Sequence, residues 1–376
     1  MTGVYFHIPF CAKKCPYCDF YSVSYSKETV SRYVGAILRN IAFYEITDTV
    51  DTLYFGGGTP SLLTPAQIGE ILDACAKAYK LAENAEITLE FNPTGKRDDY
   101  LKAVRAAGVN RLSIGTQSFS DTQLRLLGRT HTAEDNRHAV YAAQAAGFTN
   151  LSCDLMLATP DQSEEVLSET LDALTALPIT HVSAYMLQIE DGTPLSRDGA
   201  LLSRCPDEDA TVDRYLQAVR RLEAAGFLQY EVSSFAKPGH ESRHNLKYWH
   251  GAPYLGIGAG AHSCGEPPLA GASQCRFAAK VGWERFCVPK DIEAFITAEH
   301  QPVEILDEHP LDREERLMLA LRLTEGVPEA ELSAKARRRI PALLQAGYLR
   351  REGERIALTP EGFAVSNAVI AELIEE

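Results

Sequence analysis

Short apolar runs alternate with longer amphipathic segments, and this alternation limits how the chain can fold more than any other feature. Six runs rich in β-branched and aromatic residues cover residues 3–9, 52–58, 86–93, 111–117, 151–157 and 181–187. The segments between them have apolar residues at helical spacing, as residues 64–80 and 133–147 show. Residues 64–80 also open with a capping threonine and a proline at the first helical position. Strands that alternate with helices form parallel sheets. The pattern predicts an α/β fold, either a partial barrel of six β/α units or a doubly wound sheet.

Three regions follow one another along the 376 residues. Strict alternation covers residues 1–205, which we expect to form the partial barrel. A mixed α+β segment with many glycines and prolines follows over 206–305. Residues 306–376 contain helical segments and a hairpin pattern over 347–358 with its turn at Glu352-Gly353, so we expect a small winged-helix-like domain there.

The net charge of -14 argues against an extended nucleic-acid surface, because phosphates are repelled by an acidic protein. The basic run Arg337 to Arg339 is too short to change this expectation. The sequence has no apolar run of the roughly 18 to 20 residues that span a membrane, and residues 1–10 lack the order of a signal peptide. We therefore expect a cytoplasmic protein that does not bind nucleic acid.

Three of the nine cysteines form a C-x3-C-x2-C loop after the first predicted strand, namely Cys11, Cys15 and Cys18. The other six are scattered and are expected to be mostly small buried residues. Three local thiols can hold an iron–sulfur cluster that keeps one iron open. One alternative is a zinc site completed by a histidine such as His7 or by another cysteine, but no second short ligand pair follows in the sequence. The other alternative is a redox pair of Cys15 and Cys18, which leaves Cys11 without a role.

Together with Tyr17 and the glycine-rich end of the second strand, this loop resembles the radical S-adenosylmethionine (SAM) superfamily. The resemblance implies a [4Fe-4S] cluster on the three cysteines and SAM on the open iron. It also implies that the backbone of Gly57, Gly58 and Thr59 receives the SAM amino group. A tight strand-to-helix turn would require glycine equally well.

Polar residues at the ends of successive predicted strands should converge on one mouth of the barrel. By the same resemblance, Glu90 binds the ribose hydroxyls of SAM, since a carboxylate accepts two hydrogen bonds from a diol. The remaining residues that the resemblance places around the nucleoside and methionine are Tyr5, Gln117, Arg129 and Asp154. An ordinary ion pair is the alternative for Arg129 and Asp154.

Four further blocks resemble the oxygen-independent coproporphyrinogen III oxidase family across nearly the whole chain: residues 5–11, 115–119, 127–131 and 359–363. Within that family the chain is most similar to a haem-chaperone branch. Phe20 stands where the decarboxylase has a fourth cysteine, and only ten residues precede Cys11. These two departures disfavour the decarboxylase.

The segment from His244 to Trp249 matches the H-N-x-x-Y-W pattern of the haem-chaperone branch. The resemblance makes His244 the candidate axial ligand of haem, and imidazole is a common ligand of haem iron. Without the resemblance, Tyr248 and Trp249 would be ordinary packing residues; Cys205, which precedes Pro206, is a weaker haem-thiolate candidate.

The resemblance implies a haem chaperone that carries a cluster and SAM. Its partners would be haem, an electron donor for the cluster, and acceptor haem proteins, with respiratory enzymes at the membrane among the candidates. The alternative is the oxidative decarboxylation of two propionates of coproporphyrinogen III, in which a radical derived from SAM abstracts a propionate hydrogen.

Overall fold

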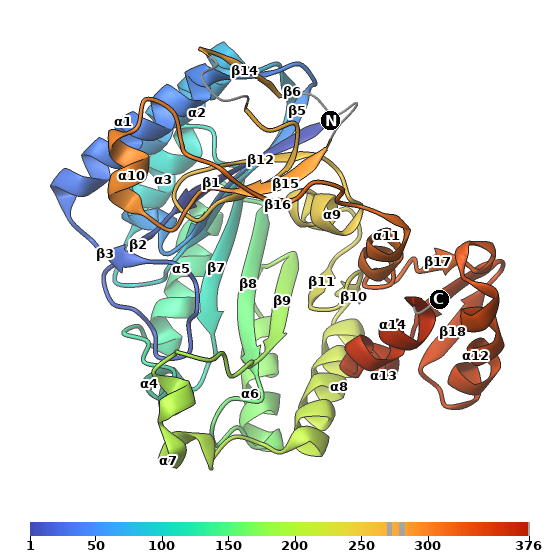
Figure 1. The fold of residues 1–376 in the computed structure, drawn as a ribbon. Helices are drawn as coiled ribbons and strands as arrows, with labels where there is room; N and C mark the ends of the chain where they lie inside the picture. The colour runs from blue at the N-terminus through green and yellow to red at the C-terminus, as the bar shows by residue number, and fades with distance from the viewer. Residues whose placement is uncertain (269–272, 278–282, 375–376) are drawn as a thin grey trace. The chain divides into compact units, whose positions relative to one another are not determined.

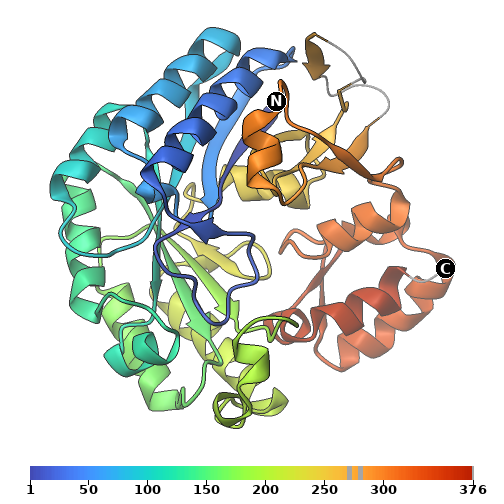
Figure 2. The ribbon, with the colours of Figure 1, turned by 60° about the vertical axis from the view of Figure 1, so that its left-hand side comes forward.

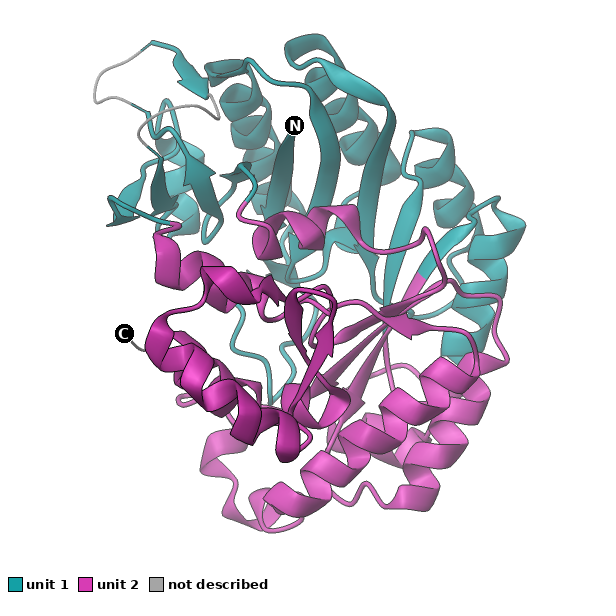
Figure 3. Cartoon of the chain, turned by 90° about the vertical axis from the view of Figure 1, so that its right-hand side faces the viewer, with its two compact units in different colours: residues 1–115, 134–151, 252–310 teal, residues 116–133, 152–251, 311–376 magenta. Residues whose placement is uncertain are grey.

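The structure, a computed structural model, describes residues 1–268, 273–277 and 283–374. It divides into two compact units, which Figure 3 distinguishes by colour. Unit 1 comprises residues 1–115, 134–151 and 252–310, and unit 2 comprises residues 116–133, 152–251 and 311–376. The chain passes from one unit to the other within β7 (Arg111–Gln117) and again within β8 (Asn150–Leu157). The predicted domain boundaries at residues 205 and 305 stay predictions.

A mostly parallel sheet forms the centre of unit 1 (Figure 1). Its strands follow the order β7, β6 (Leu81–Phe91), β5 (Val50–Gly57), β1 (Thr2–Ile8), β12 (Tyr254–Ile257), β13 (His262–Gly265), β15 (Glu284–Cys287) and β16 (Glu304–Asp307). The pairs from β7 to β12 are parallel, and those from β12 to β16 are antiparallel. Val4, Phe6 and Ile8 of β1 are completely buried, as expected of a parallel strand inside a sheet.

Two short strand pairs accompany this sheet: β2 (Phe10–Cys11) with β3 (Val23–Ser24), and β4 (Tyr44–Ile46) with β14 (Cys275–Phe277). The helices of this part of the chain are α1 (Lys27–Phe43), η1 (Pro60–Leu62), α2 (Pro65–Ala78), α3 (Asp98–Ala106), α5 (Ala133–Ala145) and α10 (Ile292–Thr297). In Figure 2, α1 lies against α2, and α2 against α3.

The start of α2 confirms the capping prediction. Thr64 accepts a hydrogen bond from the Gln67 main-chain N–H, and the Gln67 side chain accepts one from the Thr64 N–H at 2.9 Å. Pro65 occupies the first helical position, where its missing N–H needs no partner. This reciprocal pair satisfies two backbone donors that the first helical turn leaves open.

Unit 2 contains a second set of paired strands. Here β8 pairs in parallel with β9 (His181–Met186), and β11 (Ser234–Ala236) and β10 (Leu228–Gln229) continue the order in antiparallel pairs. The accompanying helices are α4 (Asp121–Leu126), α6 (Glu164–Thr175), η2 (Leu195–Arg197), α7 (Gly199–Leu202), α8 (Glu208–Ala224) and α9 (Arg243–Trp249). Arg221 of α8 forms an ion pair with Asp172 of α6, which ties the two helices together.

The C-terminal part of unit 2 is a small mixed region. Its elements are α11 (Arg313–Ala320), β17 (Val327–Pro328), η3 (Glu329–Glu331), α12 (Ala334–Gln345), β18 (Leu349–Glu352), β19 (Arg355–Leu358), α13 (Pro360–Ala364) and α14 (Ser366–Ile374). The predicted hairpin is confirmed, since Glu352 pairs with Arg355 across a loop in which Gly353 has a φ of 59°. Glycine adopts this left-handed conformation without steric cost.

All six predicted strands form, although β6 begins at Leu81 rather than at residue 86. In the described part of the chain, no helix combines the length and apolar character needed to cross a membrane.

Candidate functional site

Cys11 ends β2 of unit 1, and Cys15 and Cys18 lie on the loop between β2 and β3; all three are half-buried free thiols. The Cys18 N–H donates to the Cys15 carbonyl oxygen at 3.2 Å, which makes a tight turn between these two residues. The Thr59 hydroxyl lies 3.6 Å from the Cys11 sulfur, within reach of a weak hydrogen bond. The loop therefore presents three thiols beside the end of β5.

The surroundings of Cys18 disfavour its thiolate. Burial raises the pKa of Cys18, and the neighbouring thiols of Cys15 and Cys11 raise it further. A bound cationic iron centre would lower the pKa of such thiols, because it stabilises thiolates. Within the described ranges, no three His, Cys, Asp or Glu side chains converge as ligands of one metal ion do. The thiolates of an iron–sulfur cluster bind different irons, so this donor set fits a cluster without such convergence.

The glycines at the end of β5 allow close approach of neighbouring groups. A Cβ on Gly57, whose φ is +111°, would lie 2.7 Å from the His7 ring. A Cβ on Gly58 would lie 2.8 Å from the Phe10 carbonyl oxygen and 3.0 Å from that of Ile8. Both the turn and the cofactor interpretation of this segment require glycine, so the strand end has an open backbone that a side chain would fill.

Glu90 at the end of β6 holds that open backbone in place. One carboxylate oxygen accepts the Gly57 N–H at 3.1 Å, and the other accepts the Tyr54 hydroxyl at 3.1 Å. The predicted residues Glu90 and Gly57 are therefore direct neighbours in unit 1. The carboxylate that the sequence assigned to the ribose also orients the glycine-rich strand end.

The sequence interpretation missed Tyr54, and it considered His7 only as a zinc ligand. The Tyr5 hydroxyl lies 3.1 Å from His7 Nδ1, and His7 Nε2 lies 3.2 Å from the Tyr21 carbonyl oxygen. Tyr54 is the register partner of Tyr5 on the adjacent strand. The period of two along β1 was the available signal, since it places Tyr5 and His7 on one face.

In unit 2 the end of β7 contacts the middle of β8. Gln117 has a φ of 61°, which is uncommon outside glycine and typical of constrained functional positions. Its neighbour Thr116 donates from its hydroxyl to the Asp154 carbonyl oxygen at 2.6 Å. His131, two residues after Arg129, contacts the Thr116 carbonyl oxygen at 3.3 Å. Thr116, the neighbour of Gln117, thus contacts the Asp154 main chain, and the segment after Arg129 returns to Thr116 through His131.

Helix α9 carries the segment from His244 to Trp249. Ser242 caps the helix by accepting from the Asn245 N–H. His244 is buried, with 1% of its surface exposed, and its Nε2 lies 2.9 Å from the Tyr248 hydroxyl. Coordination of iron by this nitrogen requires it to leave Tyr248. The Trp249 ring is half-buried, with the Arg322 guanidinium 6.0 Å from its centre.

Known protein families and proteins are similar to this chain along nearly its whole length. Residues 5–174 match the model of the radical SAM superfamily, and residues 310–365 match the HemN C-terminal domain. "Heme chaperone HemW" of Mycobacterium tuberculosis is 35% identical over 383 residues, covering 99% of this chain and 94% of that protein. The Escherichia coli protein of the same name is 42% identical over 265 residues, covering 69% of each. This chain belongs to the HemW family of radical SAM proteins.

A mitochondrial protein and a solved structure are also similar to this chain. A Bos taurus protein, "Radical S-adenosyl methionine domain-containing protein 1, mitochondrial", is 41% identical over 282 residues, covering 72% of this chain and 62% of that protein. The solved structure of coproporphyrinogen III oxidase (HemN) from Escherichia coli superposes with a TM-score of 0.77 at 20% identity, covering 99% of this chain and 90% of that one. The second likeness shows the fold alone. The predicted α/β radical SAM fold is confirmed.

Membership of the HemW family makes the exposed position of Phe20 notable. Phe20 follows the cysteine loop with 61% of its surface exposed, and its carbonyl oxygen accepts a hydrogen bond from Lys14 Nζ at 3.1 Å. Tyr17 lies half-buried between Cys15 and Cys18. An apolar side chain therefore projects from the loop where the resemblance to the decarboxylase would require a thiol.

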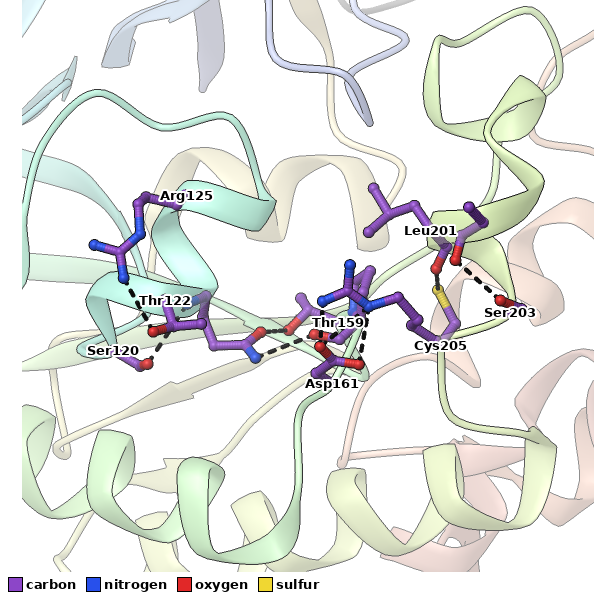
Figure 4. A network of polar contacts seen from close by, with 12 residues as sticks. Ser120, Thr122, Arg125, Thr159, Asp161, Leu201, Ser203 and Cys205 are labelled. Atoms are coloured by element: carbon purple, nitrogen blue, oxygen red, sulfur yellow. Dashed lines mark hydrogen bonds and ion pairs between the residues drawn. The ribbon is translucent and has the colours of Figure 1, made fainter.

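The remaining cysteines of this HemW-family chain mostly follow the sequence prediction, since Cys75, Cys153, Cys264 and Cys275 are buried. Cys205, the weaker haem-thiolate candidate, is half-buried, and its sulfur lies 3.9 Å from the Leu201 carbonyl oxygen (Figure 4). Burial raises the pKa of Cys205, and the Asp161 carboxylate raises it further. Both effects disfavour the thiolate that a haem iron would need.

Proposed function

We propose that this protein binds haem and delivers it to acceptor haem proteins, with a [4Fe-4S] cluster on Cys11, Cys15 and Cys18 and with SAM as a second cofactor. The observation that carries the proposal is the similarity to heme chaperones named HemW along almost the entire chain. The presence of Phe20 in place of a fourth cysteine agrees with it. The likeness to coproporphyrinogen III oxidase rests on fold alone and supports no second candidate.

The residues of unit 1 would bind and orient the cofactors. When bound, the cluster supplies an iron for the methionine group of SAM and an entry point for an electron. Glu90 keeps the Gly57 backbone in position, and Thr59 donates toward the Cys11 sulfur. We also assign Tyr5, Tyr17, Gly58, Gln117, Arg129 and Asp154 to the binding of SAM.

The partners follow from this function. Haem is the cargo, and we propose that it binds at the segment of α9 from His244 to Trp249. Acceptors would be haem proteins, with respiratory enzymes at the membrane as the first candidates to examine. An electron donor would reduce the cluster.

The cluster assignment is tested by anaerobic reconstitution of purified protein with iron and sulfide. Cys15→Ser should lose most of the iron and the visible absorption of the cluster, because one of three ligands is gone. Cys287→Ser, a half-buried cysteine of unit 1 outside the loop, is the matched control and should retain both. Equal iron content in the two variants would contradict the assignment.

The cargo is tested on the same reconstituted sample by measuring haem and 5′-deoxyadenosine together. We expect stoichiometric haem, and transfer of that haem to an apo-acceptor. Protoporphyrinogen and 5′-deoxyadenosine produced together from coproporphyrinogen III would instead identify the decarboxylase. A protein that binds no haem would refute the chaperone proposal.

A further inference from the structure

A cavity of about 550 Å³ opens in unit 2 beside the C-terminal end of α9. Its wall residues come from α9 and its C-cap, from α11 and from η3, and include Trp249, His250, Arg313, Arg316, Leu317, Ala320 and Glu331. Ligand pockets in proteins usually enclose about 300 to 1,000 Å³. Resting on the proposed function, we propose that this cavity is the haem site, with His250 as an iron ligand and Arg313 and Arg316 as partners of the propionates.

His250 has the arrangement of a metal-binding histidine. Its Nε2 lies 3.1 Å from a Glu325 carboxylate oxygen, and its side chain is 47% exposed. Because a carboxylate oxygen accepts hydrogen bonds, the neutral imidazole that contacts it has its proton on Nε2 and its lone pair on Nδ1. Among the described residues, none forms a hydrogen bond with Nδ1. Histidines that bind metals commonly donate their other N–H to a carboxylate in this way.

His244 lacks these properties, although it belongs to the same segment. It is 1% exposed, its Nε2 lies against the Tyr248 hydroxyl, and it is absent from the cavity wall. His250 lies in the cavity wall and is exposed, so ligation by its imidazole does not require the contact between His244 and Tyr248 to break. His244 would then support the site by packing within α9, and Trp249 connects the segment to the cavity because it belongs to both.

The remaining walls match the rest of the haem molecule, a flat apolar ring with two carboxylates. Trp249, Leu317 and Ala320 offer apolar surface. Arg313 and Arg316 are exposed and lie three residues apart, which puts them on one side of α11. Each donates to a main-chain carbonyl, that of Glu331 and that of Leu311 respectively. A guanidinium carries five N–H donors in a planar fork, and this geometry suits a carboxylate.

The test is a titration of the purified full-length protein with hemin, protoporphyrin IX and hemin dimethyl ester, followed by the Soret band. His250→Ala should weaken hemin binding roughly tenfold and shift the Soret band, yet leave protoporphyrin IX, which has no iron, unchanged. The double variant Arg313→Gln/Arg316→Gln should weaken hemin and protoporphyrin IX roughly tenfold but leave the dimethyl ester unchanged, because the ester has no carboxylates.

Matched controls remove the same groups elsewhere. His309→Ala removes an exposed imidazole, and Arg337→Gln/Arg338→Gln removes two exposed guanidinium groups on α12. Both should bind all three ligands as the unaltered protein does, and unchanged thermal unfolding shows that each variant is folded. If His250→Ala and the Arg313/Arg316 variant bind hemin as tightly as the controls, this cavity is not the haem site, while the proposed chaperone function stands. If the unaltered protein binds no hemin, both proposals fall.

Discussion

Gly58 lies where the backbone that follows β1 comes closest to the end of β5. Two main-chain oxygens, those of Phe10 and Ile8, would lie within 3.0 Å of a Cβ at this position. Main-chain atoms cannot move aside as the end of a flexible side chain can. The absence of a side chain at Gly58 is therefore a requirement of the packed structure.

Gly58→Ala should lower the free energy of unfolding by about 1 to 3 kcal/mol, because overpacking forces the backbone apart. Gly35→Ala is the matched control: Gly35 lies in α1, where a Cβ would meet nothing closer than Arg39 at 4.0 Å, and alanine there should stabilise by about 0.5 to 1 kcal/mol. Urea unfolding of both variants measures the difference. A Gly58→Ala protein as stable as Gly35→Ala would contradict the close contact.

The buried imidazole of His7 makes the stability of the protein depend on pH. Burial lowers the pKa of His7 to about 4, partly offset by the hydrogen bond to the Tyr21 carbonyl, with further lowering by His262 and Lys290. The folded protein keeps the imidazole neutral, whereas the unfolded chain protonates it near pH 6.5. This contribution to stability is therefore complete above pH 6.5 and is lost as the pH falls through 4.

We expect the free energy of unfolding of the cluster-free protein to fall by about 3 kcal/mol between pH 6.5 and 4 from this group. His7→Asn should remove that part of the slope, and His309→Asn, at an exposed position, should keep it. Urea unfolding at several pH values gives the comparison. Parallel slopes for His7→Asn and the unaltered protein would show that His7 is not the group responsible.

At the scale of elements, a chain of polar contacts positions the start of α9. Ser152 on β8 lies 2.7 Å from His181 Nδ1, and His181 Nε2 lies 2.8 Å from the Tyr230 hydroxyl. The same hydroxyl accepts the N–H of Ser242, the capping residue of α9, at 3.2 Å. The helix that carries His244 is thus connected to the strands of unit 2 through Tyr230.

Tyr230→Phe should destabilise the protein by about 2 to 3 kcal/mol, because it deprives two buried groups, His181 Nε2 and the Ser242 N–H, of this partner. It should also weaken haem binding at α9, since the first turn of the helix loosens. Tyr141→Phe, at a position 51% exposed on α5, is the matched control and should stay within about 0.5 kcal/mol. Equal unfolding midpoints for the two variants would refute the role of Tyr230.

At the scale of the whole molecule, charge decides which partners are accessible. The net charge of -14 and an isoelectric point near 5.3 disfavour polyanions. The C-terminal region has helices and a hairpin, as small nucleic-acid-binding domains also do, but the arginines of its hairpin lie among carboxylates: Arg351 contacts Glu329, and Arg350 contacts Glu352. At the hairpin, these carboxylates therefore offset the positive charge that nucleic-acid binding would need.

We expect no retention of duplex DNA or RNA in a filter-binding assay at low salt, where electrostatic attraction is strongest. A basic protein of similar size serves as the positive control. Retention that falls steeply with added salt would contradict this expectation and assign the C-terminal region a different partner.

Much of the architecture follows from local sequence. The six strands, the capping of α2 by Thr64 and the hairpin turn at Gly353 depend on neighbours a few residues away, so periodicity and turn chemistry predict them. The same holds for the cysteine loop, whose three thiols lie within eight residues. The early start of β6 was not predictable, because pairing with β5 extends a strand beyond its apolar run.

Only the tertiary structure decided which groups meet and which are exposed. Glu90 and Gly57 are 33 residues apart in sequence and directly bonded in space. His244 and His250 stand in one short segment, and the sequence pattern singles out His244, yet His244 is buried against Tyr248 and His250 lines a cavity. Burial and contact depend on elements that are distant in sequence, which is why residue type and spacing determined the chemistry available to this protein, while packing determined where that chemistry is accessible.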